Sequence, residues 1–215
     1  MKKLILIFAF ALPCAGAGAQ PEKLMDSLRK KYDEVGFFVN GFTRVRIGDK
    51  WGDIDTTGKL IIPVKYNFID DFSKGFAIVE SGNKWGFVDT AGKEVAPLKY
   101  DMVDGFIGSF AGVCLNDKWG FVDTTGKIII PLKYEGIDYF NEGFAGIKLN
   151  GKWGIIDTAG KTIVPVLYDA VRYFPDKGFI TARLYDKKFA FDKTGKEIKK
   201  KQEDIPSPDL IRLRI

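Results

Sequence analysis

A tryptophan–glycine motif recurs along this chain at a fixed interval, and that interval constrains the fold more than any other feature. Four tryptophans lie 34 residues apart, at positions 51, 85, 119 and 153. The residues around them recur too: residues 84–95 read KWGFVDTAGKEV and residues 118–129 read KWGFVDTTGKII. A catalytic motif is needed once. A fixed period of this length instead indicates stacked or radial repeats, in which each unit completes the core of its neighbour.

Other residue types recur with the same 34-residue spacing. Each unit carries a glycine after the tryptophan, then an aspartate, a Gly-Lys pair, a proline, a tyrosine and a phenylalanine, the last three at Pro63, Pro97, Pro131 and Pro165; Tyr66, Tyr100, Tyr134 and Tyr168; and Phe72, Phe106, Phe140 and Phe174. The ends are degenerate. Residues 41–52 contain a half-unit, and residues 187–198 keep the turn sequence but place Phe189 where a tryptophan is expected, 36 residues after Trp153. Degenerate terminal units are typical of capped arrays.

Each unit contains three short extended runs, which predict an antiparallel three-strand meander. In the second unit the first run is residues 76–80 and the second is residues 84–89; in the third unit the third run is residues 127–134. Links such as LNGK and DTTGK are tight-turn sequences. The proline column places the third run at an edge or at a bend, because proline cannot donate a backbone hydrogen bond. The second run is apolar at adjacent positions, so we expect it to lie centrally.

Two aromatic columns are the main candidates for the core between units. Large aromatic side chains bury ~150–250 Å² each, and a 34-residue meander is too small to fold alone. We therefore predict an inter-unit core built from Trp51, Trp85, Trp119, Trp153, Tyr66, Tyr100, Tyr134 and Tyr168. In the first run, Ala111 and Val113 alternate with Gly112 and Cys114. This alternation predicts that Cys114 faces outward, in the column held elsewhere by Arg46, Glu80 and Lys148.

The combined columns resemble the WG-repeat (KWG-repeat) β proteins, over about residues 41–198. These are bacterial arrays of units reading roughly W-G-x-[IV]-D-x-x-G-K-x-[IV]-I-P-x-x-Y. The resemblance implies a non-catalytic β-repeat scaffold, often exported. It implies no catalytic, cofactor-binding or metal-binding residue.

The predicted fold is all-β: tandem ~34-residue antiparallel three-strand units in a propeller-like or solenoid array, with a short N-terminal capping helix. The predicted boundaries are a helix or cap over residues 20–36, the WG-repeat domain over residues 37–198, and a linker with a C-terminal strand over residues 199–215. The helix would place Leu24, Leu28 and Val35 on one face. The tail alternates apolar and basic residues, so we expect it to dock as an edge strand.

Residues 1–19 read as a secretory signal peptide, with Lys2 and Lys3 before a short apolar stretch and a small-residue site at 17–19. Cleavage before Gln20 would place the protein outside the cytoplasm, secreted or periplasmic. A lipoprotein acylated at Cys14 is the alternative, which Pro13 disfavours. No later stretch reaches the ~18 apolar residues of a membrane span.

Composition narrows the function. The chain has no histidine, so it lacks the commonest general base and metal ligand. Its formal charge is only +5, with 28 acidic against 33 basic residues, which does not favour nucleic acid. The DTTG sequences favour aspartate-stabilised turns over calcium loops. Paired carboxylates such as Asp70 and Asp71 could suggest glycoside chemistry, but Asp70, Asp104 and Asp138 form a repeat column, which favours a scaffold surface.

The sequence therefore predicts an exported, non-catalytic scaffold that mediates protein interaction, with no catalytic, cofactor or metal residues. The alternative is a carbohydrate-binding module that uses an aromatic surface, and the partner is then a glycan. The sequence leaves the ligand, the oligomeric state and the choice between propeller and solenoid open.

Overall fold

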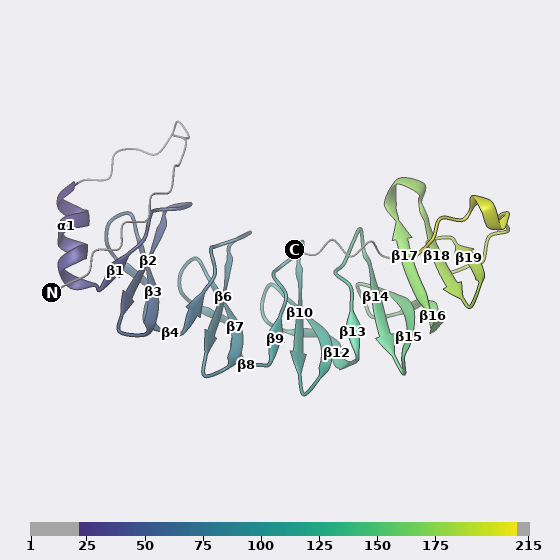
Figure 1. Ribbon diagram of the computed structural model, residues 1–215, viewed down its shortest axis with the longest axis horizontal. Helices are drawn as coiled ribbons and strands as arrows, with labels where there is room; N and C mark the ends of the chain where they lie inside the picture. Colours follow the sequence, from purple (N-terminus) through teal and green to yellow (C-terminus); the bar gives the residue numbers. More distant parts are fainter. Residues whose placement is uncertain (1–21, 210–215) are drawn as a thin grey trace.

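A computed structural model describes residues 22–209 as five small antiparallel sheets that lie side by side in a curved row (Figure 1). The helix α1 (Glu22–Lys31) stands at one end of the row. The row is an open arc in this part of the chain and does not close into a barrel. The predicted signal peptide, Cys14 and the predicted strand at residues 210–215 lie outside the described residues.

The sheets follow one another in chain order. The first holds β1 (Glu34–Val35), β2 (Phe42–Ile47), β3 (Lys50–Asp55) and β4 (Leu60–Tyr66). The second holds β5 (Phe68–Ile69), β6 (Phe76–Ser81), β7 (Lys84–Asp89) and β8 (Glu94–Tyr100). The third holds β9 (Met102–Val103), β10 (Phe110–Leu115), β11 (Lys118–Asp123) and β12 (Ile128–Tyr134). The fourth holds β13 (Gly136–Ile137), β14 (Phe144–Leu149), β15 (Lys152–Asp157) and β16 (Thr162–Tyr168). The fifth holds β17 (Ala170–Phe174), β18 (Phe179–Leu184) and β19 (Lys187–Phe191), with 3-10 turns at Pro175–Lys177 and Gln202–Asp204.

The predicted all-β repeat array is confirmed, and each of the first four sheets has one strand more than expected. A two-residue strand precedes the three predicted strands in the chain and pairs with the first of them, as β5 does with β6. Two residues are too short to show an alternating pattern, so this strand left no signal in the sequence. The second run is central and the third run is the edge strand, as predicted.

The proline column is explained by that edge position. Pro63, Pro97, Pro131 and Pro165 are all exposed on the edge strands. The pairing of β3 with β4 also shifts register between Trp51 and Ile54, which is a β-bulge opposite Pro63. Both physical options for a strand proline, an unpaired edge and a bend, are therefore used together.

The core of the molecule lies between sheets. Phe87, Ala96 and Tyr100 of the second sheet pack with Ala111 and Val113 of the third. The neighbouring Val88 points the other way, into the cluster shared with the first sheet. Adjacent residues of each central strand thus serve opposite interfaces, which is why this strand is apolar at consecutive positions.

The tryptophan and tyrosine columns contribute unequally to the core between sheets. Tyr66, Tyr100 and Tyr134 are buried, whereas Tyr168 and all four tryptophans are only half-buried. Each tryptophan pairs across its own sheet with the tyrosine of the same unit, as Trp51 does with Tyr66. The Trp85 ring meets Phe68 of its own sheet at 5.7 Å. The tyrosines, more than the tryptophans, therefore fill the inter-sheet core.

Both ends of the row are covered. Leu28 of α1 and the following Tyr32 pack on Val45 and Ile54 of the first sheet, so the predicted N-terminal cap is present. Val35 is not on the helix, because it belongs to β1 and pairs with Val45. At the other end, Ile205 packs on Phe179 and Ala190 of the last sheet.

The register of the fifth sheet corrects the sequence alignment of the last unit. Arg183, in the column of Arg46 and Lys148, pairs with Lys188. The position of the missing tryptophan is therefore held by Lys188, and Phe189 takes the place of the following glycine. The aromatic column shifts as well: Tyr173, and not Phe174, stacks on Phe144, with ring centroids 4.9 Å apart.

The prediction that Cys114 faces outward into solvent is wrong, because Cys114 is buried. Its cross-strand neighbours are Met102 and Trp119. In the other sheets this column holds long charged side chains, which can extend past their neighbours into water. The short cysteine side chain cannot, so its neighbours cover it.

The repeated aspartate after each central strand stabilises a turn. Asp55 Oδ1 accepts hydrogen bonds from the backbone N–H of Thr57 at 2.8 Å and of Lys59 at 3.0 Å. Where the second turn residue is threonine, its hydroxyl also donates to the aspartate. The pKa values of Asp55, Asp123 and Asp192 are lowered, first by this hydroxyl. The aspartate-stabilised turn predicted from the sequence is therefore confirmed.

The glycine in these turns also sets the distance between sheets. Gly92 has a φ of +77°, and a Cβ built on it would overlap the carbonyl oxygen of Ile61 in the preceding sheet. Gly126 makes the same close approach to Val95. Gly82, in a hairpin turn, has a φ of +60° but open space around it.

We expect Gly92→Ala to destabilise the protein much more than Gly82→Ala. Both substitutions place an L-residue in the left-handed region, at about 1–2 kcal/mol, but only Gly92→Ala also pushes two sheets apart. Urea denaturation of the two variants measures the difference. Equal losses of stability would show that the glycine contact does not hold the sheets at this distance.

We expect Cys114 to react slowly with a thiol reagent in the native protein and quickly once it is unfolded. Burial raises the pKa of its thiol, which further lowers its reactivity. Peptide mapping by mass spectrometry follows the modification at this residue. Thr90→Cys, in an exposed turn, is the control that should react faster.

Candidate functional site

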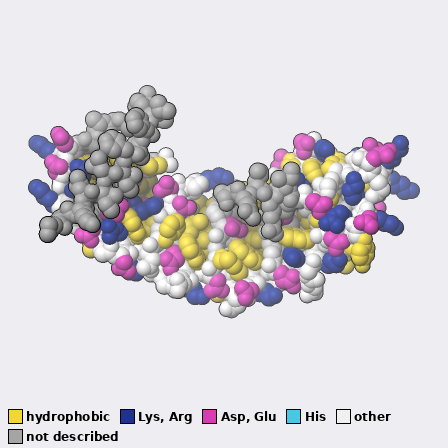
Figure 2. Space-filling view, in the orientation of Figure 1, with side chains coloured by type: hydrophobic (Ala, Val, Ile, Leu, Met, Phe, Trp, Pro, Cys, Tyr) yellow, Lys and Arg dark blue, Asp and Glu magenta, His cyan; other side chains and the backbone are white. Residues whose placement is uncertain are grey.

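One pocket lies at the equivalent repeat position of each of the four interfaces between successive sheets, and we number these four pockets, which do not include a separate pocket near Arg183 and Asp209, in chain order. The first is between sheets one and two, and the fourth is between sheets four and five. They occupy equivalent positions in the repeat, so they form a row along the arc. Figure 2 shows hydrophobic side chains in patches along the arc, with charged groups between them.

Two columns made up mainly of phenylalanines, distinct from the tryptophan and tyrosine columns above, line all four pockets. One column lies at the start of the first long strand of a unit, and the other belongs to the next unit. Their rings pack across each interface, with centroids 4.3–4.9 Å apart, as Phe42–Phe72, Phe76–Phe106, Phe110–Phe140 and Phe144–Tyr173. Because these pairs also hold the sheets together, this part of each pocket is fixed by the fold.

Three other columns line the same pockets and vary in chemistry. The first pocket has Arg44, Asp53 and Asp71. The equivalent residues are Ile78, Phe87 and Gly105 in the second pocket, Gly112, Phe121 and Tyr139 in the third, and Gly146, Ile155 and Arg172 in the fourth. The repeat thus combines a constant aromatic frame with a variable lining.

The four pockets also differ in size. The second pocket, narrowed by Ile78, measures about 60 Å³. The third, where glycine replaces that side chain, measures about 380 Å³. The first and fourth are intermediate, at about 230 and 170 Å³. A cavity needs only ~10–15 Å³ to admit one water, so the third pocket has room for a side chain or a small ring.

The third pocket is acidic and apolar. Asp104 and Asp138 line it together with Ile107 and the exposed ring of Tyr139. A Cβ built on Gly112 would lie 2.9 Å from an Asp104 carboxylate oxygen, so the glycine leaves room for this carboxylate. Burial raises the pKa of Asp104. No basic side chain lines this pocket in the described part of the chain.

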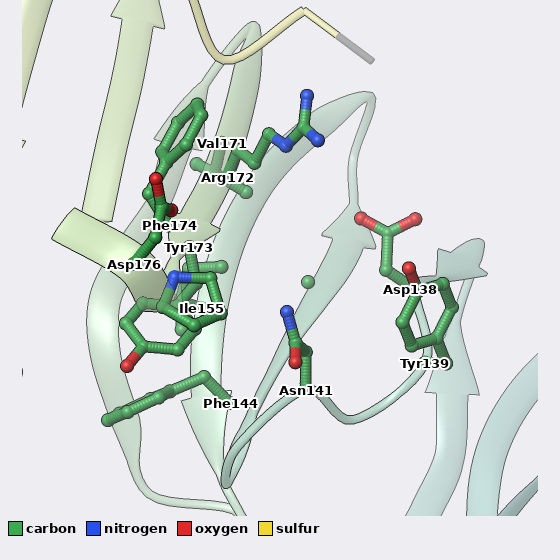
Figure 3. Close-up of a pocket in the computed structure, with 12 residues that line it drawn as sticks. Asp138, Tyr139, Asn141, Phe144, Ile155, Val171, Arg172, Tyr173, Phe174 and Asp176 are labelled. Carbon is green, nitrogen blue, oxygen red and sulfur yellow. The ribbon is translucent and has the colours of Figure 1, made fainter. Parts of the chain in front are cut away.

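The fourth pocket has charges of both signs. Figure 3 shows Asp138 and Tyr139 on one side of it and Arg172 on the other. The Arg172 guanidinium lies 5.0 Å from the Phe174 ring. Tyr173 also lines the pocket, and its hydroxyl donates to Glu142 at 3.2 Å.

The first pocket contains a buried ion pair. The Asp53 side chain is 5% exposed, and its Oδ1 lies 3.7 Å from Arg44 Nε, too far for a hydrogen bond. Arg44 instead donates to Asp71 of the next sheet at 3.0 Å. Among residues 22–209, neither Asp53 Oδ1 nor Arg44 Nε has a hydrogen-bond partner. Burial, opposed by Arg44, raises the pKa of Asp53 to about 6.

The tryptophan and tyrosine columns predicted from the sequence frame the sheets, but the pocket linings come from other columns. The signal was present in the sequence, as positions that vary while the rest of the unit repeats. The lysines that directly precede the tryptophans are partly in ion pairs: Lys84 contacts Asp101 at 2.5 Å and Lys152 contacts Asp169 at 2.6 Å. Within residues 22–209, no group of three or more acidic or cysteine side chains could hold a metal, and no helix could span a membrane.

A curved row of small antiparallel sheets with a pocket at each interface defines a tandem β-repeat protein. The sequence matches the WG containing repeat over five consecutive segments, residues 28–51, 52–85, 85–119, 119–153 and 153–188. The chain therefore belongs to the WG-repeat family. No curated protein matches it significantly.

Similarity to solved structures is distant. Hsv2p of Kluyveromyces lactis is 14% identical with a TM-score of 0.42, and the match covers 77% of this chain and 62% of that one. A eukaryotic initiation factor is 14% identical with a TM-score of 0.46, over 74% of this chain and 50% of that one. The extracellular domain of a one component system from B. thetaiotaomicron is 11% identical with a TM-score of 0.35, over 81% and 30%. The chain spans less than two thirds of each of them, and the similarity is too low to assign a function.

We expect Asp53→Asn to raise the free energy of unfolding at pH 7 by about 3 kcal/mol, at 1.36 kcal/mol per unit of pKa. The folded pKa, about 6, lies above the unfolded value of 3.8. The native state therefore holds a proton that the unfolded state releases, and stability falls as the pH rises from about 4 to about 6.

Urea denaturation between pH 4 and 8 tests this expectation. The stability of the variant should fall less from pH 4 to 6 than that of the parent protein, because the raised pKa of Asp104 remains while that of Asp53 is removed. Below pH 4 both proteins should lose stability, because the lowered pKa values of Asp55, Asp123 and Asp192 remain. Identical pH profiles would contradict the account of Asp53.

Proposed function

We propose that this WG-repeat protein is an exported, non-catalytic scaffold that binds an extended segment of a partner protein along its row of pockets. The observation that carries the proposal is the combination of a constant aromatic frame with a variable lining at every interface. The fold requires the frame, but it does not require the differences among the linings. Repeat proteins commonly use such surfaces to read an extended ligand one unit at a time.

The proposal names the partner segment by its chemistry. The third pocket is the largest and presents two carboxylates beside apolar and aromatic surface. An apolar side chain would fill it, and a neighbouring basic side chain would face Asp104 and Asp138. We therefore propose an extended segment in which apolar and basic residues lie close together. Export is proposed from the pattern of residues 1–19, and absence of catalysis from the lack of histidine.

Selection of random linear peptides against the full chain tests this function. We expect the enriched peptides to carry apolar and basic residues, and Tyr139→Ala to weaken their binding by about tenfold or more, as loss of an interface aromatic does. Tyr139 is 63% exposed and lines the third and fourth pockets. Tyr185→Ala is the matched control, because Tyr185 is 75% exposed and lines neither.

Two results would contradict the proposal. One is enrichment of acidic peptides, and the other is binding that Tyr139→Ala leaves unchanged. The second candidate function is carbohydrate binding, which the exposed ring of Tyr139 favours, since a flat aromatic face can stack on a sugar. Binding to a glycan array that Tyr139→Ala abolishes, with no enrichment of peptides, would support this second function instead.

A further inference from the structure

The first pocket breaks the pattern of the repeat. Its central-strand position holds Asp53, where the equivalent residues are Phe87, Phe121 and Ile155. All three of these are buried and apolar. The residue paired with Asp53 across the sheet is Arg44, where the other units have Ile78, Gly112 and Gly146. Three copies of the unit thus show that the fold needs neither charge.

The exception carries a stability cost. A buried carboxylate is unfavourable unless its oxygens are hydrogen-bonded. Arg44 approaches Asp53 Oδ1 only to 3.7 Å and gives its short contact, 3.0 Å, to Asp71. A charge pair held in poor geometry where an apolar pair serves elsewhere is more consistent with binding than with stability.

The polar atoms define what would complete the pocket. Asp53 Oδ1 is an acceptor and Arg44 Nε is a donor, and both lack hydrogen-bond partners in the described residues. One group that both donates and accepts would satisfy the two atoms together. An ammonium group fits less well, because it would lie beside the Arg44 guanidinium. A hydroxyl group fits both partners.

The rest of the lining combines the polar Asn40, Thr43 and Asp71 with apolar and aromatic side chains. Phe42 and Phe72 stack with ring centroids 4.6 Å apart, and both line the pocket. Phe37, also in the lining, is 93% exposed, and Val39 beside it is half exposed. A ligand that places hydroxyl groups on one edge and C–H groups on a flat face matches this combination. The cavity of about 230 Å³ is far larger than one water requires.

We propose that the first pocket is a binding site for a neutral sugar residue, with a ring hydroxyl between Asp53 and Arg44 and the ring against the phenylalanines. Both atoms are buried in the unliganded structure, so the partly exposed Arg44 side chain shifts as the sugar enters. The hydroxyl then donates to Asp53 Oδ1 and accepts from Arg44 Nε. This site is separate from the third and fourth pockets, and it does not depend on the peptide-binding proposal.

Ligand-observed NMR with the full chain tests the site. The probes are methyl α-glucoside, methyl β-galactoside, methyl α-mannoside and N-acetylglucosamine, with the neutral tripeptide acetyl-Gly-Gln-Gly-amide as a non-sugar that also donates and accepts. We expect saturation transfer to at least one sugar, with a Kd on the order of 1 mM, as is usual for about a dozen heavy atoms.

Three variants make the test specific. Asp53→Phe installs the residue of the second and third units and should weaken sugar binding by about tenfold or more. Phe37→Ala, at an exposed position, should also weaken it while leaving the fold intact. Tyr185→Ala should leave sugar binding unchanged, because Tyr185 is exposed and does not line this pocket. Tyr139→Ala in the peptide selection tests the other proposal, so the failures of the two proposals are distinguishable. Unchanged thermal unfolding of Phe37→Ala would exclude misfolding as the cause.

Three outcomes would overturn the proposal. The first is no saturation transfer to any of the four sugars. The second is equal binding by Asp53→Phe and the parent protein. The third is transfer only to the tripeptide, which would show that the pocket takes a side-chain amide and is part of a protein interface.

Discussion

Contact between neighbouring sheets is the interaction on which the rest of this structure depends. No sheet has a core of its own: each central strand sends one residue, such as Phe87, into the interface ahead and the next, such as Val88, into the interface behind. Burial of this area is the main favourable term in folding. The turn glycines allow the backbone of one sheet to meet that of the next. The spacing of the row and the position of the pockets both follow from this contact.

Much of the fold could be predicted from the sequence, because each position of the unit occurs several times and its residues can be compared between units. The constant columns identified the strands and the turns, and the helical pattern before the repeat identified the N-terminal cap. The short strands such as β5 were missed, since two residues carry no period. Cys114 was assigned to the wrong environment because alternation gives the direction of a side chain, whereas burial depends on how far its neighbours extend.

The candidate site was harder to predict for the opposite reason. The residues that repeat most clearly are the tryptophans and tyrosines, which frame the sheets. The residues that distinguish one pocket from another lie in a column that varies between units, occupied by Arg44, Ile78, Gly112 and Gly146. Such variation can be read as noise until the structure shows that these residues share one location. In a repeat protein, the positions that the fold does not constrain are therefore the first place to look for ligand specificity.

The way α1 covers the first sheet has an evolutionary consequence. Leu24 of the helix approaches Gly58, at the position where Ile61 of the first sheet approaches Gly92. The helix therefore substitutes for a preceding sheet and contacts a surface that every unit carries in some form. A gene segment encoding one whole unit could be lost or duplicated by recombination without redesign of either end. Such an event would change the number and order of pockets in a single step, and the length of the array can thus evolve separately from the chemistry of each site.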